Sequence, residues 1–128
     1  LMGAVAFQKG LGAVHALSHP IGAIYNTHHG LTNAVLLPHV LRANRKAIDD
    51  SISTLSYYLE IKNGFDGFLN FIDYLNATLN VPKGLKELGV LKGDFDQIID
   101  GALKDPSKSC NPIELNIQNL RTILNTAL

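Results

Sequence analysis

The sequence predicts an all-α domain built as a helical bundle, and three observations support this prediction. Apolar residues recur at helical spacing in almost every segment, as in Ile48, Ile52, Leu55 and Leu59. Alternation of apolar and polar residues, which would indicate strands, is scarce. Without strands to connect, no Asn-Gly or Asp-Gly pair is assigned to a hairpin turn. The chain has 128 residues, of which 46% are hydrophobic and 17% charged. These values are typical of one globular domain, and we expect a single domain over residues 1–128.

Two helices are predicted in the first third of the chain. The first runs from about residue 11 to residue 24 and contains Pro20, which should kink it because proline lacks the N–H of the helical ladder. The pair Asn26-Thr27 then turns the chain. The second helix opens at residues 28–30 and runs to about residue 42, with an expected interruption at Pro38.

Scaffold helices are predicted over the rest of the chain, residues 45–128. Tyr57 and Tyr58 lie on the first of them and are expected to be half-buried in the core. Asn116 is a plausible N-cap of the last helix, and Gly89 a plausible C-terminal stop of a short one. The predicted scaffold helices cover residues 48–59, 68–79 (ended by Val81-Pro82), 85–88, 95–102 (ended near Asp105-Pro106) and 117–127.

Composition excludes several classes of function. The formal net charge is zero and no basic stripe is present, so nucleic acid is not expected as a partner. No run approaches the ~20 apolar residues of a membrane span, so no membrane association is expected either. The single cysteine, Cys110, rules out an internal disulfide and favours a reducing compartment, the cytoplasm. The opening LMGAVAF has helical character but no cap residue, and we therefore expect the chain to be part of a longer polypeptide.

The segment GLGAVHALSHPIGAIYNTHHG holds four of the five histidines and carries the functional prediction. Imidazole is the commonest protein ligand of transition metals and a proton carrier near neutral pH. His15 and His19 are four residues apart and share one helix face, while His28 and His29 begin the next helix. This arrangement can direct two or three imidazoles at one ion, which makes residues 10–44 the candidate metal-site segment. We expect His28 to be a solvated residue at the helix start, and His39 to serve packing or face solvent.

The pattern HALSHPIGAIYNTHHGLTNAVLLPHVLRAN resembles the signature of the iron-containing (group III) alcohol dehydrogenases, H-x3-H-P-L/I-G-A-x5-H-G-x2-N-A-x2-L-P. Weaker similarity continues through Val81-Pro82 to Asn111-Pro112 and the last helix. The resemblance implies that this chain is the later part of the family's C-terminal helical domain. The family's N-terminal α/β dinucleotide-binding domain and its Asp-x3-His metal motif would then lie upstream.

The resemblance also implies roles for individual residues. The family binds its metal through one aspartate and three histidines, and two of these histidines correspond to His15 and His29. His19 matches an additional histidine beside the substrate, a candidate catalytic residue for proton relay. Phe7 corresponds to an aromatic residue that often lies near the nicotinamide of the cofactor.

The implied reaction is the interconversion of a small alcohol and an aldehyde or ketone. Hydride passes to or from NAD or NADP, and a divalent metal polarises the substrate oxygen. Fe(II) suits such ligands, and Zn(II) or Ni(II) could occupy the same site. The full-length enzyme is expected to be a homo-oligomer and this piece alone inactive. Glycerol dehydrogenases and maleylacetate reductases have a similar fold, so the substrate stays open. The alternative is a self-contained helical metal-binding module that uses His15, His19 and His29 without catalysis.

Overall fold

The computed structural model describes residues 10–128, and this part of the chain contains α-helices and short 3-10 helices but no strand. The all-α prediction is therefore confirmed. The order of elements is α2 (Ala13–Tyr25), α3 (His29–Tyr58), α4 (Gly64–Thr78), η1 (Leu85–Leu88), η2 (Lys92–Asp94), α5 (Phe95–Lys104), η3 (Pro106–Cys110) and α6 (Ile117–Ala127). Over residues 10–128, no helix has both the length and the apolar character needed to cross a membrane.

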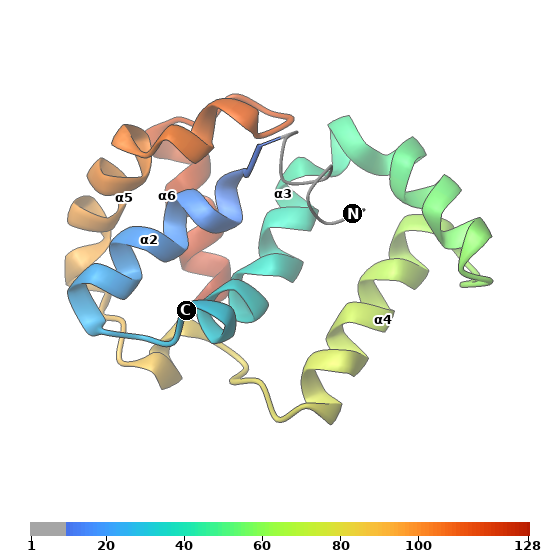
Figure 1. Ribbon diagram of the computed structural model, residues 1–128, viewed down its shortest axis with the longest axis horizontal. Helices are drawn as coiled ribbons and strands as arrows, with labels where there is room; N and C mark the ends of the chain where they lie inside the picture. The colour runs from blue at the N-terminus through green and yellow to red at the C-terminus, as the bar shows by residue number, and fades with distance from the viewer. Residues whose placement is uncertain (1–9) are drawn as a thin grey trace.

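Helix α3 lies at the centre of the molecule, with α2, α5 and α6 on one side and α4 on the other (Figure 1). One buried apolar cluster joins α2, the first half of α3, α5 and α6, and includes Leu17, Leu36, Ile98 and Leu124. Helix α4 forms an antiparallel pair with α3 and buries Phe65. The metal-site segment therefore rests on the main core, whereas the second half of α3 and α4 extend away from it.

Helix α3 differs from the sequence prediction, which expected one helix to end near residue 42 with an interruption at Pro38. The structure has one continuous helix of 30 residues, with Pro38 inside it. Pro38 cannot donate the N–H that the Ala34 carbonyl would normally accept. Asn76 of α4 supplies that bond instead, since its Nδ2 donates to the Ala34 oxygen at 2.9 Å. No glycine or proline follows before Gly64, so nothing ends the helix at residue 42.

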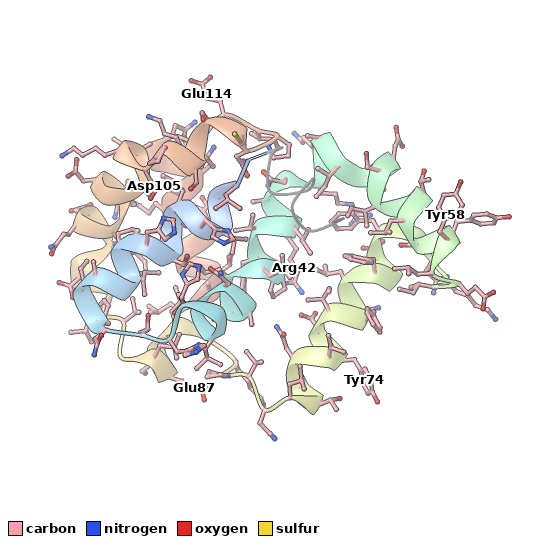
Figure 2. All side chains as sticks on the ribbon, in the orientation of Figure 1. Arg42, Tyr58, Tyr74, Glu87, Asp105 and Glu114 are labelled. Atoms are coloured by element: carbon pink, nitrogen blue, oxygen red, sulfur yellow. The ribbon has the colours of Figure 1, made fainter. Side chains whose placement is uncertain are left out.

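The predicted positions of Tyr57 and Tyr58 are wrong. Their exposed fractions are 81% and 77%, so neither is half-buried. Both lie at the last turn of α3, in the part of the helix that extends beyond the main core, and Tyr58 projects at the edge of the molecule (Figure 2). Helical spacing places these residues on a helix correctly, but it does not tell how far the neighbouring helices reach along it.

The predicted helix ends agree better with the structure. Gly89 has a φ of 86° and ends the short helix η1, which is a 3-10 helix. Asn116 caps α6 and forms a reciprocal capping box with Asn119. The N-cap of α2 is Gly12, which has no side chain, and Asn111 from the far end of the sequence accepts the Ala13 N–H at 3.2 Å. The start of α2, and with it His15, is thus fixed by the C-terminal segment.

Candidate metal centre

Three of the predicted histidines lie together where α2 passes the start of α3. His15 and His19 occupy successive turns of α2, and His29 is the first residue of α3. The ring centroids are 5.2 Å apart for His15 and His29, 5.8 Å for His15 and His19, and 5.4 Å for His19 and His29. The rings of His19 and His29 are stacked, with an interplanar angle of 13°.

The turn between α2 and α3 fixes this juxtaposition. Asn26 ends α2 in the left-handed conformation, with a φ of 51°, which asparagine tolerates better than most residues. The buried Thr32 hydroxyl then donates to the Thr27 hydroxyl at 2.8 Å and ties the turn to the first helical turn of α3. His28 is the exposed N-cap of α3, and its Nδ1 accepts from the Leu31 N–H. The prediction that His28 is a helix-start residue is confirmed.

The Nε2 atoms of His15 and His29 face the same amide group. Asn33 Nδ2 lies 3.4 Å from His15 Nε2 and 3.1 Å from His29 Nε2. Because both nitrogens approach one atom, they are directed at a common point. Ser18 lies behind the pair: its hydroxyl donates to the His15 carbonyl at 3.3 Å and is 3.5 Å from His29 Nδ1. Two imidazole nitrogens that converge in this way are a suitable donor pair for a divalent transition metal.

Burial favours the neutral form of one of these imidazoles, since it lowers the pKa of His15 below 6.5. The neighbouring imidazoles of His29 and His19 lower this pKa further, whereas Asp105 acts in the opposite direction. A metal binds the neutral imidazole, because the ligating nitrogen must offer a free lone pair. The local electrostatics of His15 thus favour the form that a metal needs.

His19 has a different partner from the other two histidines. Its Nδ1 lies 2.7 Å from Asp105 Oδ2, although the two residues are 86 positions apart in the sequence. The Asp105 side chain (Figure 2) is only 12% exposed, and its other oxygen accepts the Ser107 N–H at 2.8 Å. Burial by itself would raise the pKa of the Asp105 carboxyl, but the hydrogen bonds from His19 and Ser107 outweigh it and hold that pKa below its usual value.

Residues 10–128 contain no group of three or more His, Cys, Asp or Glu side chains arranged to hold an ion. Asp105 engages His19 Nδ1, and the Asn33 amide contacts His15 and His29. His15 and His29 fit two positions of a metal shell, and the described chain does not complete it.

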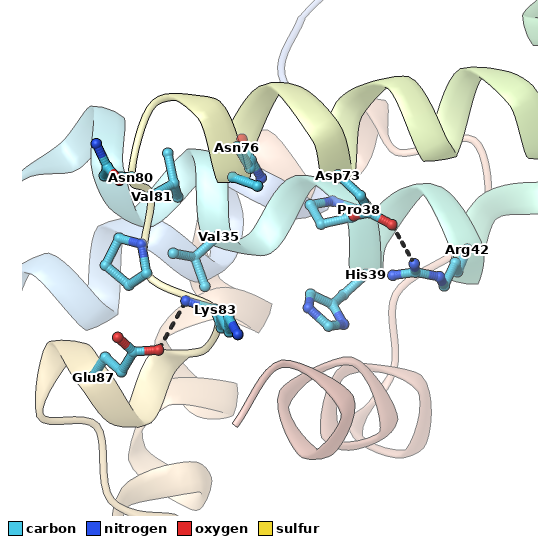
Figure 3. A pocket seen from close by; sticks show the side chains of 12 residues that line it. Val35, Pro38, His39, Arg42, Asp73, Asn76, Asn80, Val81, Lys83 and Glu87 are labelled. Carbon is cyan, nitrogen blue, oxygen red and sulfur yellow. Dashed lines mark hydrogen bonds and ion pairs between the residues drawn. The ribbon is translucent and has the colours of Figure 1, made fainter.

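The structure also locates the other predicted residues. His39 is half-buried in a pocket between α3, α4 and the segment after α4, away from the three clustered histidines (Figure 3). Phe7 lies outside the described residues.

A cavity of about 650 Å³ opens beside His15 and Asn33. Its lining is mostly apolar and comes from the start of α2, from α3 and from the segment around Asn111. Leu37, Leu41 and Ile48 lie on the α3 side. An apolar cavity with a few polar groups at one end is typical of small-molecule sites.

The sequence profile of the Fe-containing alcohol dehydrogenase family, C-terminal region, matches residues 1–128. The chain belongs to the iron-containing alcohol dehydrogenase family. It is 37% identical to a 4-hydroxybutyrate dehydrogenase of Cupriavidus necator, over 100% of this chain and 36% of that protein. It is 32% identical to a lactaldehyde reductase of Escherichia coli strain K12, over 92% of this chain and 33% of the relative.

Solved structures of an oxidoreductase and of an alcohol dehydrogenase agree with the fold. A crystal structure of 1,3-propanediol oxidoreductase superposes with a TM-score of 0.86 at 33% identity, over 92% of this chain and 33% of that one. An alcohol dehydrogenase from Oenococcus oeni gives a TM-score of 0.85 at 26% identity, with the same coverage of 92% and 33%. The chain thus spans about a third of the length of the relatives it matches.

The sequence prediction missed Asn33, Ser18 and Asp105, which contact the three histidines. Asn33 could have been found, because it lies four residues after His29 on the same helix and therefore on the same face. Ser18 lies between His15 and His19, but its position gives no sign that it faces His29. Asp105 had no detectable signal, because only the packing of α5 on α2 brings it to His19.

Proposed function

We propose that this chain is the C-terminal helical domain of an NAD- or NADP-dependent alcohol dehydrogenase whose active site holds a divalent metal. The reaction would interconvert a small alcohol and its aldehyde or ketone by hydride transfer. The convergence of His15 Nε2 and His29 Nε2 on one point carries the proposal, because it occurs in a chain that belongs to the iron-containing alcohol dehydrogenase family. The names of the relatives, which include dehydrogenases and a reductase of small hydroxy compounds, support this substrate class.

His15 and His29 would hold the metal together with ligands from upstream of the described chain. A bound divalent ion supplies Lewis acidity toward the oxygen of an alcohol or a carbonyl compound, and Fe(II), Zn(II) or Ni(II) would serve. The apolar cavity beside His15 would exclude water from the hydride path. Phe7 is the residue that we predict to contact the nicotinamide.

His19 is the proposed proton carrier. Asp105 engages its Nδ1, so its Nε2 is the nitrogen left to accept or release a proton. The His19 side chain is 43% exposed, which gives the proton a path to water. The His19 ring stacks on the ring of His29, which is itself a proposed metal ligand, so His19 lies next to the proposed metal site.

The test is the metal content of the full-length protein. We expect His15→Ala and His29→Ala, after reconstitution with Fe(II) without oxygen or with Zn(II), to retain less than about a tenth of the wild-type metal, since each removes one ligand. His28→Ala is the matched control, because it removes the neighbouring imidazole, which caps α3 and does not face the common point. Elemental analysis measures the ratio of metal to protein.

Wild-type metal content in either ligand variant would overturn the assignment of that histidine. One tightly held ion on the 128-residue chain alone, lost in His19→Ala, would instead favour the three-histidine module. Reduction of NAD+ or NADP+ with small primary alcohols, followed by absorbance, tests the reaction itself.

A further inference from the structure

We propose that Asn33 is a positioning residue that holds the two metal-binding nitrogens together before an ion enters. The proposal rests on the proposed function, since it takes His15 and His29 as ligands. Asn33 touches both imidazoles, and its amide does not titrate. Its contribution would be to set the direction of the rings and the nitrogen on which each carries its proton.

The contacts of the Asn33 amide define a particular state of both rings. An amide nitrogen carries two N–H donors, and it lies 3.1 Å from His29 Nε2 and 3.4 Å from His15 Nε2. Each Nε2 must therefore accept, which places the ring proton on Nδ1. The Ser18 hydroxyl agrees with this assignment for His29, because it is 3.5 Å from Nδ1 and donates its own hydrogen to the His15 carbonyl. Nε2 is left with the lone pair that a metal requires.

The other half of the Asn33 amide is its carbonyl oxygen. Asn33 Oδ1 is buried and has no hydrogen-bond donor among the described residues. With both ring protons on Nδ1, turning the amide over would direct the oxygen lone pairs at the lone pairs of both Nε2 atoms, which is unfavourable. Buried polar atoms without a partner are uncommon and call for a particular explanation. Here the explanation is that the amide nitrogen serves two acceptors at once.

The backbone makes this role possible. Asn33 lies one turn after His29 on α3, so its side chain covers the same face of the helix. His15 approaches from α2, and the amide is thus the polar link between the two ring nitrogens of the two helices. Without it, each ring could rotate about its side-chain bonds or carry its proton on Nε2. Ordering both rings would then reduce the free energy of metal binding.

The experiment measures the Zn(II) dissociation constant of the metal-free full-length protein by competition with a chelator. We expect Asn33→Ala to raise this constant about 10–100-fold, the usual cost of removing a group that orients a ligand. Asn33→Leu, which keeps the side-chain volume and loses both donors, should do the same. Asn70→Ala is the control, because Asn70 is exposed on α4, on the other side of α3 from α2 and His15.

Crystal structures of the metal-free proteins give the second readout. In the Asn33 variants, at least one of the two rings should turn so that its Nε2 no longer faces the other, whereas in Asn70→Ala both should stay. An unchanged or smaller dissociation constant in both Asn33 variants would overturn the proposal, as would rings that keep their wild-type directions. If the wild-type protein itself bound no Zn(II), the proposed function would fail, and the ring positions would still decide the role of Asn33.

Discussion

The chemistry of single residues at this site depends on which nitrogen of each imidazole carries a proton. His15 and His29 present Nε2 to the Asn33 amide, while His19 turns Nδ1 to Asp105. Three rings that lie within 6 Å of one another by their centroids thus differ in their partners. These partners separate two proposed ligands from one proposed proton carrier more clearly than the spacing of the histidines does.

The Asp105 carboxylate should affect catalysis through His19. We expect Asp105→Asn to lower kcat roughly tenfold or more and to leave metal content and KM for the alcohol nearly unchanged, because the asparagine can still cap η3 but no longer fixes the imidazole with a charged acceptor. Steady-state kinetics of the full-length enzyme, with metal analysis of the same samples, measures both.

Asp100→Asn is the control for the Asp105 variant. It removes an aspartate from the same segment, but its partner is the exposed Lys104 at 2.7 Å, one turn further along α5. Exposed pairs of this kind contribute little, so its kcat should stay within about twofold of the wild type. A wild-type kcat for Asp105→Asn would show that Asp105 does not contribute to catalysis through His19.

The residues of the site were predictable to different degrees. His15 and His29 follow from a local motif, and Asn33 follows from helical periodicity once His29 is placed. Asp105 depends on how α5 packs on α2, which involves positions 86 residues apart. Nothing in the local sequence specifies such a pair, because an aspartate before a proline is also a common helix-stop and turn residue.

At the scale of helices, one inter-helix contact allows proline inside the longest helix. Pro38 leaves the Ala34 carbonyl without its usual donor, and Asn76 of α4 replaces it. The sequence prediction treated Pro38 as a break because it considered α3 alone. Where a helix ends thus depended on a residue of the next helix, whereas the local caps at Gly89 and Asn116 were predicted correctly.

A glycine sets the distance between α2 and α5. A Cβ atom at Gly101 would lie 2.7 Å from the Cβ of Pro20, too close for any real contact. Pro20 cannot move aside easily, because its ring is fixed to the backbone of α2. Asp105 follows α5 directly, one turn after Gly101, so the same close approach brings Asp105 to His19.

Gly101→Ala should therefore destabilise the protein although alanine is the better helix former. We expect a loss of about 1–3 kcal/mol in the free energy of unfolding, since overpacking outweighs the roughly 1 kcal/mol that alanine gains over glycine. Urea-induced unfolding measures this loss. The activity of the full-length enzyme should fall as well, because α5 carries Asp105 away from His19.

Gly93→Ala provides the comparison for Gly101. A Cβ at Gly93 meets nothing within 4 Å, so this variant should be as stable as the wild type or slightly more so. Equal stability of the two alanine variants would mean that α2 and α5 are not held at this distance by Gly101.

Across the whole molecule, the two sides of α3 differ in how they are packed. The α2, α5 and α6 side carries the apolar cluster and the candidate metal centre, and its helices were predicted well by apolar spacing. The α4 side exposes large apolar residues, including Phe71 at 40%, Tyr74 at 66% and Leu79 at 65%. Periodicity finds such helices but does not tell which faces are covered, and this is why Tyr57 and Tyr58 were misplaced.

His39 lies between the two sides of the molecule, in the pocket that α3, α4 and the segment after α4 enclose (Figure 3). Burial lowers its pKa below 6.5, the nearby Arg42 guanidinium lowers it further, and Asp73 acts in the opposite direction. Arg42 and Asp73 are themselves paired at 3.0 Å across α3 and α4. Protonation of His39 therefore places a third charge in a half-buried position.

This arrangement predicts a loss of stability in mild acid that can be assigned to His39. Because the pKa of His39 is lower in the folded chain than in the unfolded chain, the unfolded chain binds a proton below about pH 6.5 that the folded chain resists. The free energy of unfolding should then fall with decreasing pH, by at most about 1.4 kcal/mol per pH unit for one proton. At about pH 7.5 and above, the residue is almost entirely neutral in both states and has no such effect.

Comparing the wild type with His39→Gln isolates the contribution of His39, because other titrating groups such as His15 are present in both proteins. Urea-induced unfolding between pH 7.5 and pH 5 should give a stability difference that changes little near pH 7.5 and shifts in favour of the glutamine variant as the pH falls through 6.5. Asp73→Asn removes the carboxylate that stabilises the protonated imidazole, so it should steepen the acid loss of the protein that retains His39. Parallel stability curves for the wild type and His39→Gln throughout this range would show that His39 protonates equally well in the folded and unfolded chains.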